Sequence, residues 1–284
     1  MEENKDKLLQ YVLAGNLNRD TILPLSGAPM IDKLGGGLTY AAVGMQLWNE
    51  QAGLMAKISP DFPRSWLDPF SSYGFDLKGI KTAHDKIDMR RFLAYEDLQT
   101  PTYNAPIEQF AKRGLKFPLA LLNYENNMIQ GAGRGQFNPK SIGISDIPDN
   151  YREARAAHIC PIDMISHQVV PSILHNGNVQ TITMRACKEY MISTAWDDIP
   201  GLLSGLTAFM ASENEIRNLF QGRSTDIWEM ADALSRFGPE YILVRMENGG
   251  QYLYDGVSKK RWMLPMYPIN IVDPTGGADA FAGG

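Results

Sequence analysis

A glycine-rich turn near residue 276 carries the residues best suited to chemistry in this sequence. Pro274 and the pair Gly276-Gly277 permit a tight turn, and small residues there let another molecule approach the backbone closely. If a helix begins at Gly276, its first amides are unpaired and suit a phosphoryl oxygen. Asp279 would then lie in the first turn, where a carboxylate can accept the proton of an attacking hydroxyl. The turn therefore predicts phosphoryl transfer; a purely structural turn, with Asp279 favoured by the helix dipole, is the alternative.

A second candidate is Ser212-Glu-Asn-Glu215, which follows an expected strand. Phosphoryl transfer from ATP requires Mg²⁺, an ion that keeps several waters and takes few protein oxygens directly. The same Ser-x-x-Glu spacing also forms a capping box at the start of a helix. Glu215 therefore has two predicted roles, and one side chain can fill both.

The composition excludes several classes of function. The chain has 284 residues and a formal net charge of −5 with mixed signs, which argues against nucleic acid as the main partner. Its charged N-terminus lacks the apolar core of a signal peptide, and no apolar run reaches the length of a membrane span. Cys160 and Cys187 have no metal-ligand spacing. We therefore expect a cytoplasmic protein with two reduced thiols and no nucleic-acid or membrane partner.

Short apolar runs alternate with helical patterns along most of the chain. The clearest helix is expected over Ser224–Phe237, with Ser224 or Thr225 as its cap and Gly238-Pro239 as its stop. This alternation predicts an α/β fold in which helices sandwich a mainly parallel sheet. The expected strands are Tyr11–Ala14, Gly53–Ile58, Gln180–Met184, Leu206–Met210, Tyr241–Val244 and Ile269–Val272.

Residues 80–121 interrupt this alternation. The run Met89–Tyr95 alternates in a way that is typical of strands that are not fully buried. Together with residues 16–25, it predicts a small sheet projecting from the main body; an irregular surface excursion is the alternative. Arg90 and Arg91 are expected to be solvated charges of this small sheet; contact with an anionic substrate is the alternative.

The sequence stops shortly after the glycine-rich turn. Only about two turns of the helix expected from Gly276 are present, and an α/β domain rarely ends at such a point. We therefore expect residues 1–284 to be a single domain that is truncated at its C-terminus.

The order of residues in the turn is more specific than its glycine content. Asp273-Pro-Thr-Gly-Gly-Ala-Asp-Ala-Phe-Ala-Gly closely resembles the C-terminal signature of ribokinase-like (PfkB-type) carbohydrate kinases. Leu34-Gly-Gly-Gly-Leu-Thr-Tyr-Ala-Ala-Val-Gly44, followed by Ala56–Pro63, resembles their N-terminal glycine signature, and Gly15–Asp20 resembles their first strand. The resemblance extends over nearly the whole chain. It implies a ribokinase-like fold with a small β-sheet lid over the sugar.

The resemblance also implies roles for individual residues. Asp279 would be the catalytic base, and the amides of Gly276, Gly277 and Ala278 would be the anion hole. The sugar would contact Asp20, Gly35 and Gly36, with Tyr40 at the sugar subsite. Arg245 and Gly250 lie in a stretch that resembles the nucleotide site, and Glu215 would help to place Mg²⁺. Asp273 and Thr275 match positions that in some members help to bind a monovalent cation such as K⁺.

Four residues depart from the family pattern. Ala278 stands at a position that is usually glycine, and it would be strained if that backbone needs a positive φ. Tyr40 replaces the sugar-binding Asn of ribokinases, which argues against ribose itself as the substrate. Arg185 stands where many members have Asp, and Glu247 replaces a common glycine. Gly249-Gly250 alone would be interpreted as a hairpin turn.

These features together predict an ATP-dependent sugar kinase, in which Asp279 is the general base and the 276–278 amides stabilise the transferring phosphoryl group. A nucleoside kinase of the same fold remains open because Tyr40 could stack on a base. A catalytically silent sugar-binding or regulatory protein also remains open. A dehydrogenase is distant, because Gly131–Gly135 lacks the dinucleotide spacing and is expected to form a plain loop. ATP, Mg²⁺ and a sugar-like small molecule are the expected partners, together with a homodimer formed through the lid.

Overall fold

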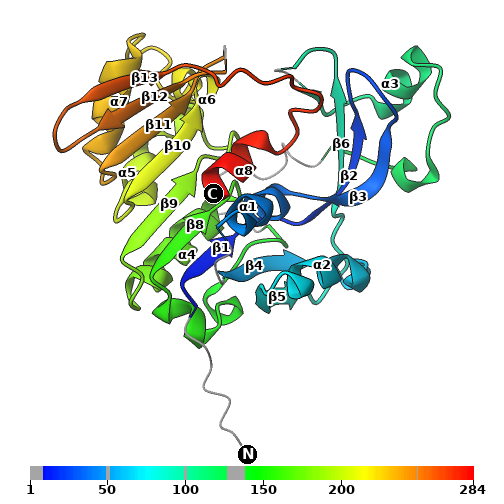
Figure 1. Cartoon of the computed structure of the whole chain (residues 1–284), viewed down its shortest axis with the longest axis horizontal. Helices are drawn as coiled ribbons and strands as arrows, with labels where there is room; N and C mark the ends of the chain where they lie inside the picture. Colours follow the sequence, from blue (N-terminus) through cyan, green and yellow to red (C-terminus); the bar gives the residue numbers. More distant parts are fainter. Residues whose placement is uncertain (1–8, 49–51, 99–100, 127–137, 248) are drawn as a thin grey trace, which may run out of the picture.

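The computed structural model describes residues 9–48, 52–98, 101–126, 138–247 and 249–284. Its main feature is a nine-stranded sheet in the order β13-β12-β11-β10-β9-β8-β1-β4-β5 (Figure 1). Strands β5 to β11 in this order pair in parallel, whereas β12 and β13 are antiparallel. The strands are β1 (Tyr11–Ala14), β4 (Ala52–Ile58), β5 (Asp76–Thr82), β8 (Ala156–Ile159), β9 (Thr181–Arg185), β10 (Ala208–Ser212), β11 (Tyr241–Arg245), β12 (Gln251–Asp255) and β13 (Arg261–Leu264).

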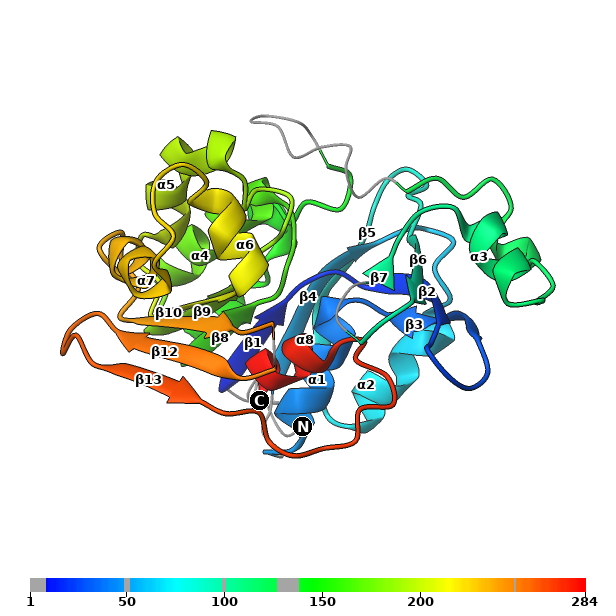
Figure 2. The same cartoon turned by 90° about the horizontal axis from the view of Figure 1, so that it is seen from above.

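Helices cover both faces of this sheet, as the alternating pattern predicts. Helices α4 to α7 lie on one face, and α1 and α8 lie on the other (Figure 2). Because the central strands are covered on both faces, β1 and β4 are almost continuously apolar and buried. The helices are α1 (Gly37–Gln46), α2 (Asp68–Ser72), α3 (Pro106–Lys112), α4 (Met164–His175), α5 (Ile199–Leu203), α6 (Glu213–Leu219), α7 (Ile227–Ser235) and α8 (Gly277–Gly283). Short 3₁₀ helices span Arg64–Leu67, Leu119–Leu121, Ile144–Asp146, Asp149–Glu153 and Ser193–Asp198.

Helix α8 packs directly on α1, and glycines permit the close approach. A Cβ atom on Gly44 would lie 2.0 Å from the carbonyl oxygen of Ala280, and one on Gly283 would lie 2.3 Å from that of Ala41. Side chains at these two positions would push the helices apart. The glycines therefore fix α8, and with it Asp279, against the start of α1.

A second, four-stranded sheet has the order β3-β2-β6-β7. One of its faces packs under α3 and the following segment through Phe92, Phe110 and Leu121. The other face carries Leu93 and Tyr95. The chain's own α3 segment therefore occupies one face of this sheet. Dimerisation through the sheet and the role of the sheet as a lid stay predictions. The strands are β2 (Asn18–Leu23), β3 (Met30–Gly35), β6 (Arg90–Tyr95) and β7 (Pro101–Thr102).

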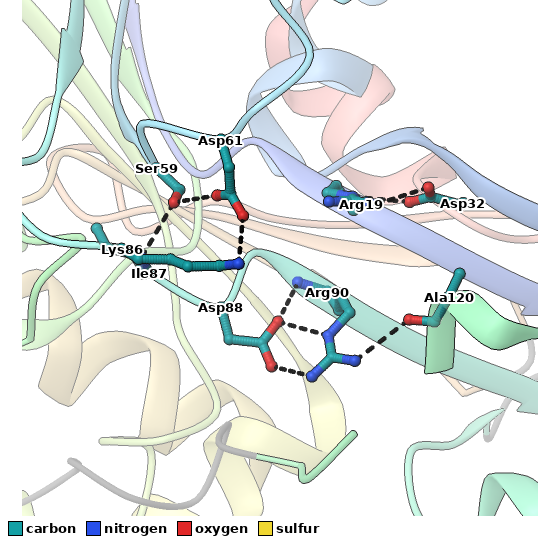
Figure 3. A network of polar contacts seen from close by, with 9 residues as sticks. All are labelled: Arg19, Asp32, Ser59, Asp61, Lys86, Ile87, Asp88, Arg90 and Ala120. Carbon is teal, nitrogen blue, oxygen red and sulfur yellow. Dashed lines mark hydrogen bonds and ion pairs between the residues drawn. The ribbon is translucent and has the colours of Figure 1, made fainter. Parts of the chain in front are cut away.

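Polar contacts fix the place where the chain passes from the main sheet to the second one (Figure 3). Ser59, after β4, donates to Asp61 at 2.5 Å and accepts the amide of Ile87 at 3.1 Å. Arg90 at the start of β6 binds Asp88 through two nitrogens, at 2.9 and 2.7 Å. Arg90 also donates to the carbonyl oxygen of Ala120 at 3.2 Å. Arg90 is therefore part of an ion pair and not a solvated charge.

The expected strands occur within about two residues of their predicted places, with one exception. Ile269–Val272 is irregular, so that prediction is wrong. The hairpin partner of β11 is β12, which pairs in turn with β13 at the edge of the sheet, and among the described residues 269–272 pair with no strand. The segment instead runs from β13 to α8 along the outside of the molecule (Figure 2).

The predicted helix after residue 224 is confirmed, but its cap is not the expected one. Asp226 is the N-cap, and its Oδ1 accepts the amides of Trp228 at 2.7 Å and Glu229 at 3.2 Å. A carboxylate next to the first turn satisfies two free amides at once, which the hydroxyls of Ser224 or Thr225 do not. Gly131–Gly135, expected to form a loop, lies outside the described residues. Within the described ranges, no helix is long and apolar enough to cross a membrane.

Candidate functional site

The glycine-rich turn has the geometry that its composition predicts. Gly276 is the N-cap of α8 and has a left-handed backbone with φ 75° and ψ −4°, a conformation that glycine adopts without steric cost. The amide of Gly277 donates to the carbonyl of Pro274 at 3.2 Å, which closes the turn. The amide of Thr275 donates to Asp273 Oδ1 at 2.9 Å. The turn is therefore held by its own backbone and by Asp273.

Two of the three amides predicted to form the anion hole are free. In the part of the chain that the structure describes, Gly276 and Ala278 donate no backbone hydrogen bond, whereas the Gly277 amide is used by the turn. Ala278 is helical and does not have a positive φ, so the strain considered for it does not arise. The left-handed residue is Gly276 instead. That the amides of Gly276, Gly277 and Ala278 form an anion hole stays a prediction.

Asp279 lies where three elements meet. Its Oδ1 accepts a hydrogen bond from Nη1 of Arg185, the last residue of β9, and the two side chains are 14% and 19% exposed. A Cβ atom on Gly37, at the start of α1, would lie 3.5 Å from the same oxygen and 3.2 Å from Cβ of Cys160. The carboxylate is therefore enclosed by α8, α1 and the end of β9. Cys160 and Cys187 are both free thiols.

Tyrosines contact the turn from α1 and from the second sheet. A Cβ on Gly276 would lie 2.1 Å from the ring of Tyr40, so this ring packs directly on the glycine. Thr275 donates from its hydroxyl to the phenol oxygen of Tyr95, at the end of β6, over 3.0 Å. Burial raises the pKa of both phenols, which keeps them neutral hydrogen-bonding groups. Thr275, which the resemblance associates with a monovalent cation, thus contacts the second sheet.

Asp20 is fully engaged by an arginine. Its two carboxylate oxygens accept from Nε and Nη2 of Arg91 at 2.9 and 2.5 Å, and only 1% of Asp20 is exposed. Burial alone would lower the pKa of Arg91, but the adjacent charge and hydrogen bonds of Asp20 raise it above its ordinary value. Arg91 was expected to be a solvated charge, and that expectation is wrong. Period-two alternation in β6 could have placed Arg91 on the same side as Asp20, because β2 and β6 pair with these residues in register.

Gly35 and Gly36 lie beside Asp20, where the backbone packs too closely for a larger side chain. A Cβ on Gly35 would lie 1.9 Å from Asp20 Oδ2, and one on Gly36 would lie 2.2 Å from the carbonyl of Asn16. Gly36 also has a φ of 98° as the N-cap of α1. The structure thus brings Asp20, Gly35 and Gly36 together, and it places Tyr40 one helical turn further along α1.

Glu215 forms the capping box that its spacing predicts. Its Oε2 accepts both the amide and the hydroxyl of Ser212 at 2.7 Å, and the Ser212 hydroxyl accepts the Glu215 amide at 3.3 Å. Both cap bonds use one oxygen, so Oε1 is left for another ligand. No group of three or more metal-ligating side chains occurs among the residues that the structure describes. Mg²⁺, a hard ion that binds few protein oxygens directly, fits a site where Glu215 Oε1 is the available donor.

The predicted nucleotide residues follow β11. Arg245, its last residue, pairs in register with Ser212 of β10 and is exposed. The amide of Met246 donates to the carbonyl of Gly250 at 2.8 Å, which confirms a hairpin turn. A Cβ on Gly250 would lie 2.7 Å from the carbonyl of Leu264. Arg185, Ser212 and Arg245 therefore share the carboxyl edge of parallel strands, where open α/β sheets bind ligands.

Comparisons with known proteins include several kinases. A cytidine kinase from Thermococcus kodakarensis is 27% identical over 277 residues, which is 98% of this chain and 87% of that protein. A putative ribokinase II from E. coli, solved with ATP and Mg²⁺, superposes with a TM-score of 0.67 at 17% identity, covering 97% of this chain and 84% of its own. An aminoimidazole riboside kinase from Salmonella enterica, solved with its riboside and an ATP analogue, has a TM-score of 0.63 at 15% identity, covering 96% and 82%. No family model matches the sequence.

Proposed function

Because this chain is a ribokinase-like protein of the PfkB type in its fold and in its motifs, we propose that it is an ATP-dependent kinase. It would transfer the γ-phosphate of ATP to a hydroxyl group of an acceptor that contains a sugar, with Asp279 as the general base. A nucleoside is the favoured acceptor, and a free sugar is the second candidate.

One observation carries the proposal: the position of Asp279. Its carboxylate lies in the first turn of α8, beside the free amides of Gly276 and Ala278 and against the start of α1. A hydroxyl that reaches this carboxylate would lie next to amides able to stabilise negative charge on a phosphoryl group. Phosphoryl transfer demands such positioning and charge stabilisation more than covalent chemistry.

The remaining predicted residues fit around this centre. Arg245 and Gly250 would border the nucleotide at the end of β11. Glu215 Oε1 would hold a hydrated Mg²⁺, which supplies neutralisation of phosphate charge when it is bound. Asp273 is exposed, and its Oδ1 supports the turn. Its proposed contribution is therefore to the shape of the cation and phosphate site.

The nucleoside is favoured by the aromatic lining of the acceptor side. Tyr40 packs on the turn, Tyr95 contacts Thr275, and Tyr103 directly follows β7. Tyr95 is buried and Tyr40 and Tyr103 are half-buried, and burial raises the pKa of all three phenols, so the rings are neutral. Such rings can stack on a base. The cytidine kinase similar over 98% of this chain supports the same acceptor.

The free sugar is favoured by the cluster of Asp20, Gly35 and Gly36, which the structure holds together. The likeness to a putative ribokinase II supports it as well. However, Asp20 already accepts two hydrogen bonds from Arg91. Further contact with a sugar hydroxyl would have to use the remaining lone pairs of the same oxygens.

The test is ADP release measured with a panel of nucleosides and free sugars in the presence of MgATP. We expect nucleosides, cytidine among them, to give the highest kcat/KM. Asp279→Asn should lower kcat by about 10²- to 10⁴-fold, because it removes the base, while acceptor affinity stays within about twofold. Asp149→Asn, at a side chain that is 97% exposed, is the matched control and should leave kcat unchanged.

Two outcomes would contradict the proposal. Binding of acceptor and ATP without ADP release from any panel member would favour a silent binding protein. An Asp279→Asn variant that turns over at the original rate would refute the assignment of the base.

A further inference from the structure

Arg185 is a cation that contacts the proposed base, Asp279, and is influenced by the charge of Glu215. It donates through Nη1 to Asp279 Oδ1. Burial alone would lower the pKa of Arg185, but the charges of Asp279 and Glu215 raise it above the ordinary value. The guanidinium therefore stays charged and lies within electrostatic reach of both the proposed base and the proposed metal-placing residue.

The guanidinium retains unused donors. Arginine has five N–H donors in a planar fork, and within the described residues Arg185 donates one hydrogen bond, to Asp279. Its side chain is 19% exposed, so a ligand in the site can reach it. By contrast, Arg91 uses two nitrogens on Asp20, a carboxylate that is almost completely buried.

The chemistry at this position favours a phosphoryl group over a neutral ligand. A guanidinium binds phosphate oxygens with two parallel hydrogen bonds. In phosphoryl transfer the moving group must lie next to the base and next to the metal. Arg185, at the end of β9, contacts Asp279 and pairs in register with Met210 of β10, the strand whose last residue, Ser212, is bonded to Glu215.

We propose that Arg185 binds the terminal phosphoryl group of ATP and that it exchanges Asp279 for this ligand as the nucleotide binds. Without nucleotide, Arg185 is paired with the carboxylate. With ATP bound, the guanidinium donates to the γ-phosphate, and Asp279 is released to accept the hydroxyl proton. The inference rests on the proposed kinase function, because it assigns the γ-phosphate to this site.

The first test compares the affinities of MgATP and MgADP, measured by titration calorimetry without an acceptor. Arg185→Met should weaken MgATP binding by about 10- to 100-fold, the range expected for hydrogen bonds between charged groups. It should change MgADP binding by less than about twofold, because ADP lacks the γ-phosphate. The MgATP affinity of Arg185→Lys should lie between that of the original protein and that of Arg185→Met, because lysine keeps the charge and loses the planar fork.

Two further variants control this test. Arg19→Met breaks another partly exposed arginine–aspartate pair, Arg19 with Asp32, and should leave the MgATP to MgADP affinity ratio unchanged. Asp279→Asn should keep the preference for MgATP, because the phosphate-binding arginine remains. If Arg185→Met does not fold, as judged by thermal denaturation, Arg185→Lys provides the measurement.

The second test detects the exchange of partners itself. The Nε–H resonance of Arg185, assigned by its absence in Arg185→Lys, should shift on adding MgATP and stay in place on adding MgADP. Equal losses of ATP and ADP affinity in Arg185→Met, or an unshifted resonance, would overturn the proposal. If Arg185→Met loses affinity for MgATP and not for MgADP, but no acceptor gives ADP release, the kinase function alone is refuted. If an acceptor gives ADP release, but Arg185→Met changes the MgATP and MgADP affinities equally, this inference alone is refuted.

Discussion

Two arginine–aspartate pairs stand at opposite sides of the proposed site, and they differ in how firmly they are held. Arg91 and Asp20 join β6 to β2 through two hydrogen bonds, and Asp20 is 1% exposed. Arg185 and Asp279 join β9 to α8 through one hydrogen bond, and Asp279 is 14% exposed. The residue types are the same, and the two arginines are equally exposed, at 19%. The difference therefore comes from the burial of the carboxylate and from the number of hydrogen bonds.

This difference separates a structural pair from an exchangeable one. Removing one partner from a buried pair leaves an uncompensated charge that water cannot reach. A pair with a single contact near solvent costs less to open, so a ligand can replace one partner. The Arg91–Asp20 pair therefore fixes the second sheet, and the Arg185–Asp279 pair is free to respond to a phosphate.

The largest stability effect should come from breaking the buried pair. Arg91→Met should lower the free energy of unfolding by about 3–5 kcal/mol, because Asp20 is left charged and buried. Chemical denaturation measures this effect. The double variant Arg91→Met/Asp20→Asn should recover part of the loss, since no buried charge remains. A loss below about 1 kcal/mol in the single variant would mean that the pair is not structural.

Acid should destabilise the region behind the exchangeable pair, because buried histidines lie there and none occurs in β2, β3, β6 or β7. Burial lowers the pKa of His158 to about 3, with a further contribution from Arg185, and that of His167 to about 4. The unfolded side chains bind protons from about pH 6.5 downward, whereas the folded ones do not. Stability should therefore be full above that pH and fall as the pH decreases.

We expect a loss of about 2–4 kcal/mol between pH 7 and pH 5, from about 1.4 kcal/mol per pH unit and group. Denaturation curves across this range measure it. His158→Gln should flatten the dependence, whereas His84→Gln, at an exposed side chain, should not. An unchanged slope in His158→Gln would show that this histidine is not held neutral.

A smaller effect should come from crowding the buried pair. In Gly35→Ala the new Cβ would lie 1.9 Å from Asp20 Oδ2, which forces the carboxylate away from Arg91. The expected cost is about 1–3 kcal/mol of unfolding free energy. Gly201→Ala in α5, where a Cβ would meet nothing within 4 Å, is the matched control. It should be neutral or slightly stabilising in the same denaturation measurement.

The smallest effect should come from the exchangeable pair. Arg185→Met should change the free energy of unfolding by about 1 kcal/mol or less, in the range of partly exposed ion pairs. Denaturation without nucleotide measures it, and the comparison with Arg91→Met is direct. A cost as large as that of Arg91→Met would remove the distinction between the two pairs.

Much of the fold was predictable because it depends on local patterns. The alternation of apolar strands and amphipathic helices predicts the sheet sandwiched by helices, and Ser212 with Glu215 predicts a capping box, because both follow from short-range spacing. Ile269–Val272 has the composition of a strand but lies in an irregular segment. Strand formation needs a partner strand that the packing brings alongside, and no local window contains that partner.

The sequence by itself determined the turn at Gly276, since only glycine adopts its left-handed backbone freely, and it determined which residues begin α8. Only the tertiary structure decided which arginine meets which carboxylate. Arg185 and Asp279 are separated by 94 positions in the chain, and Arg91 and Asp20 by 71. The strength of such contacts depends on burial and on the number of hydrogen bonds, and the packing of sheets and helices sets both.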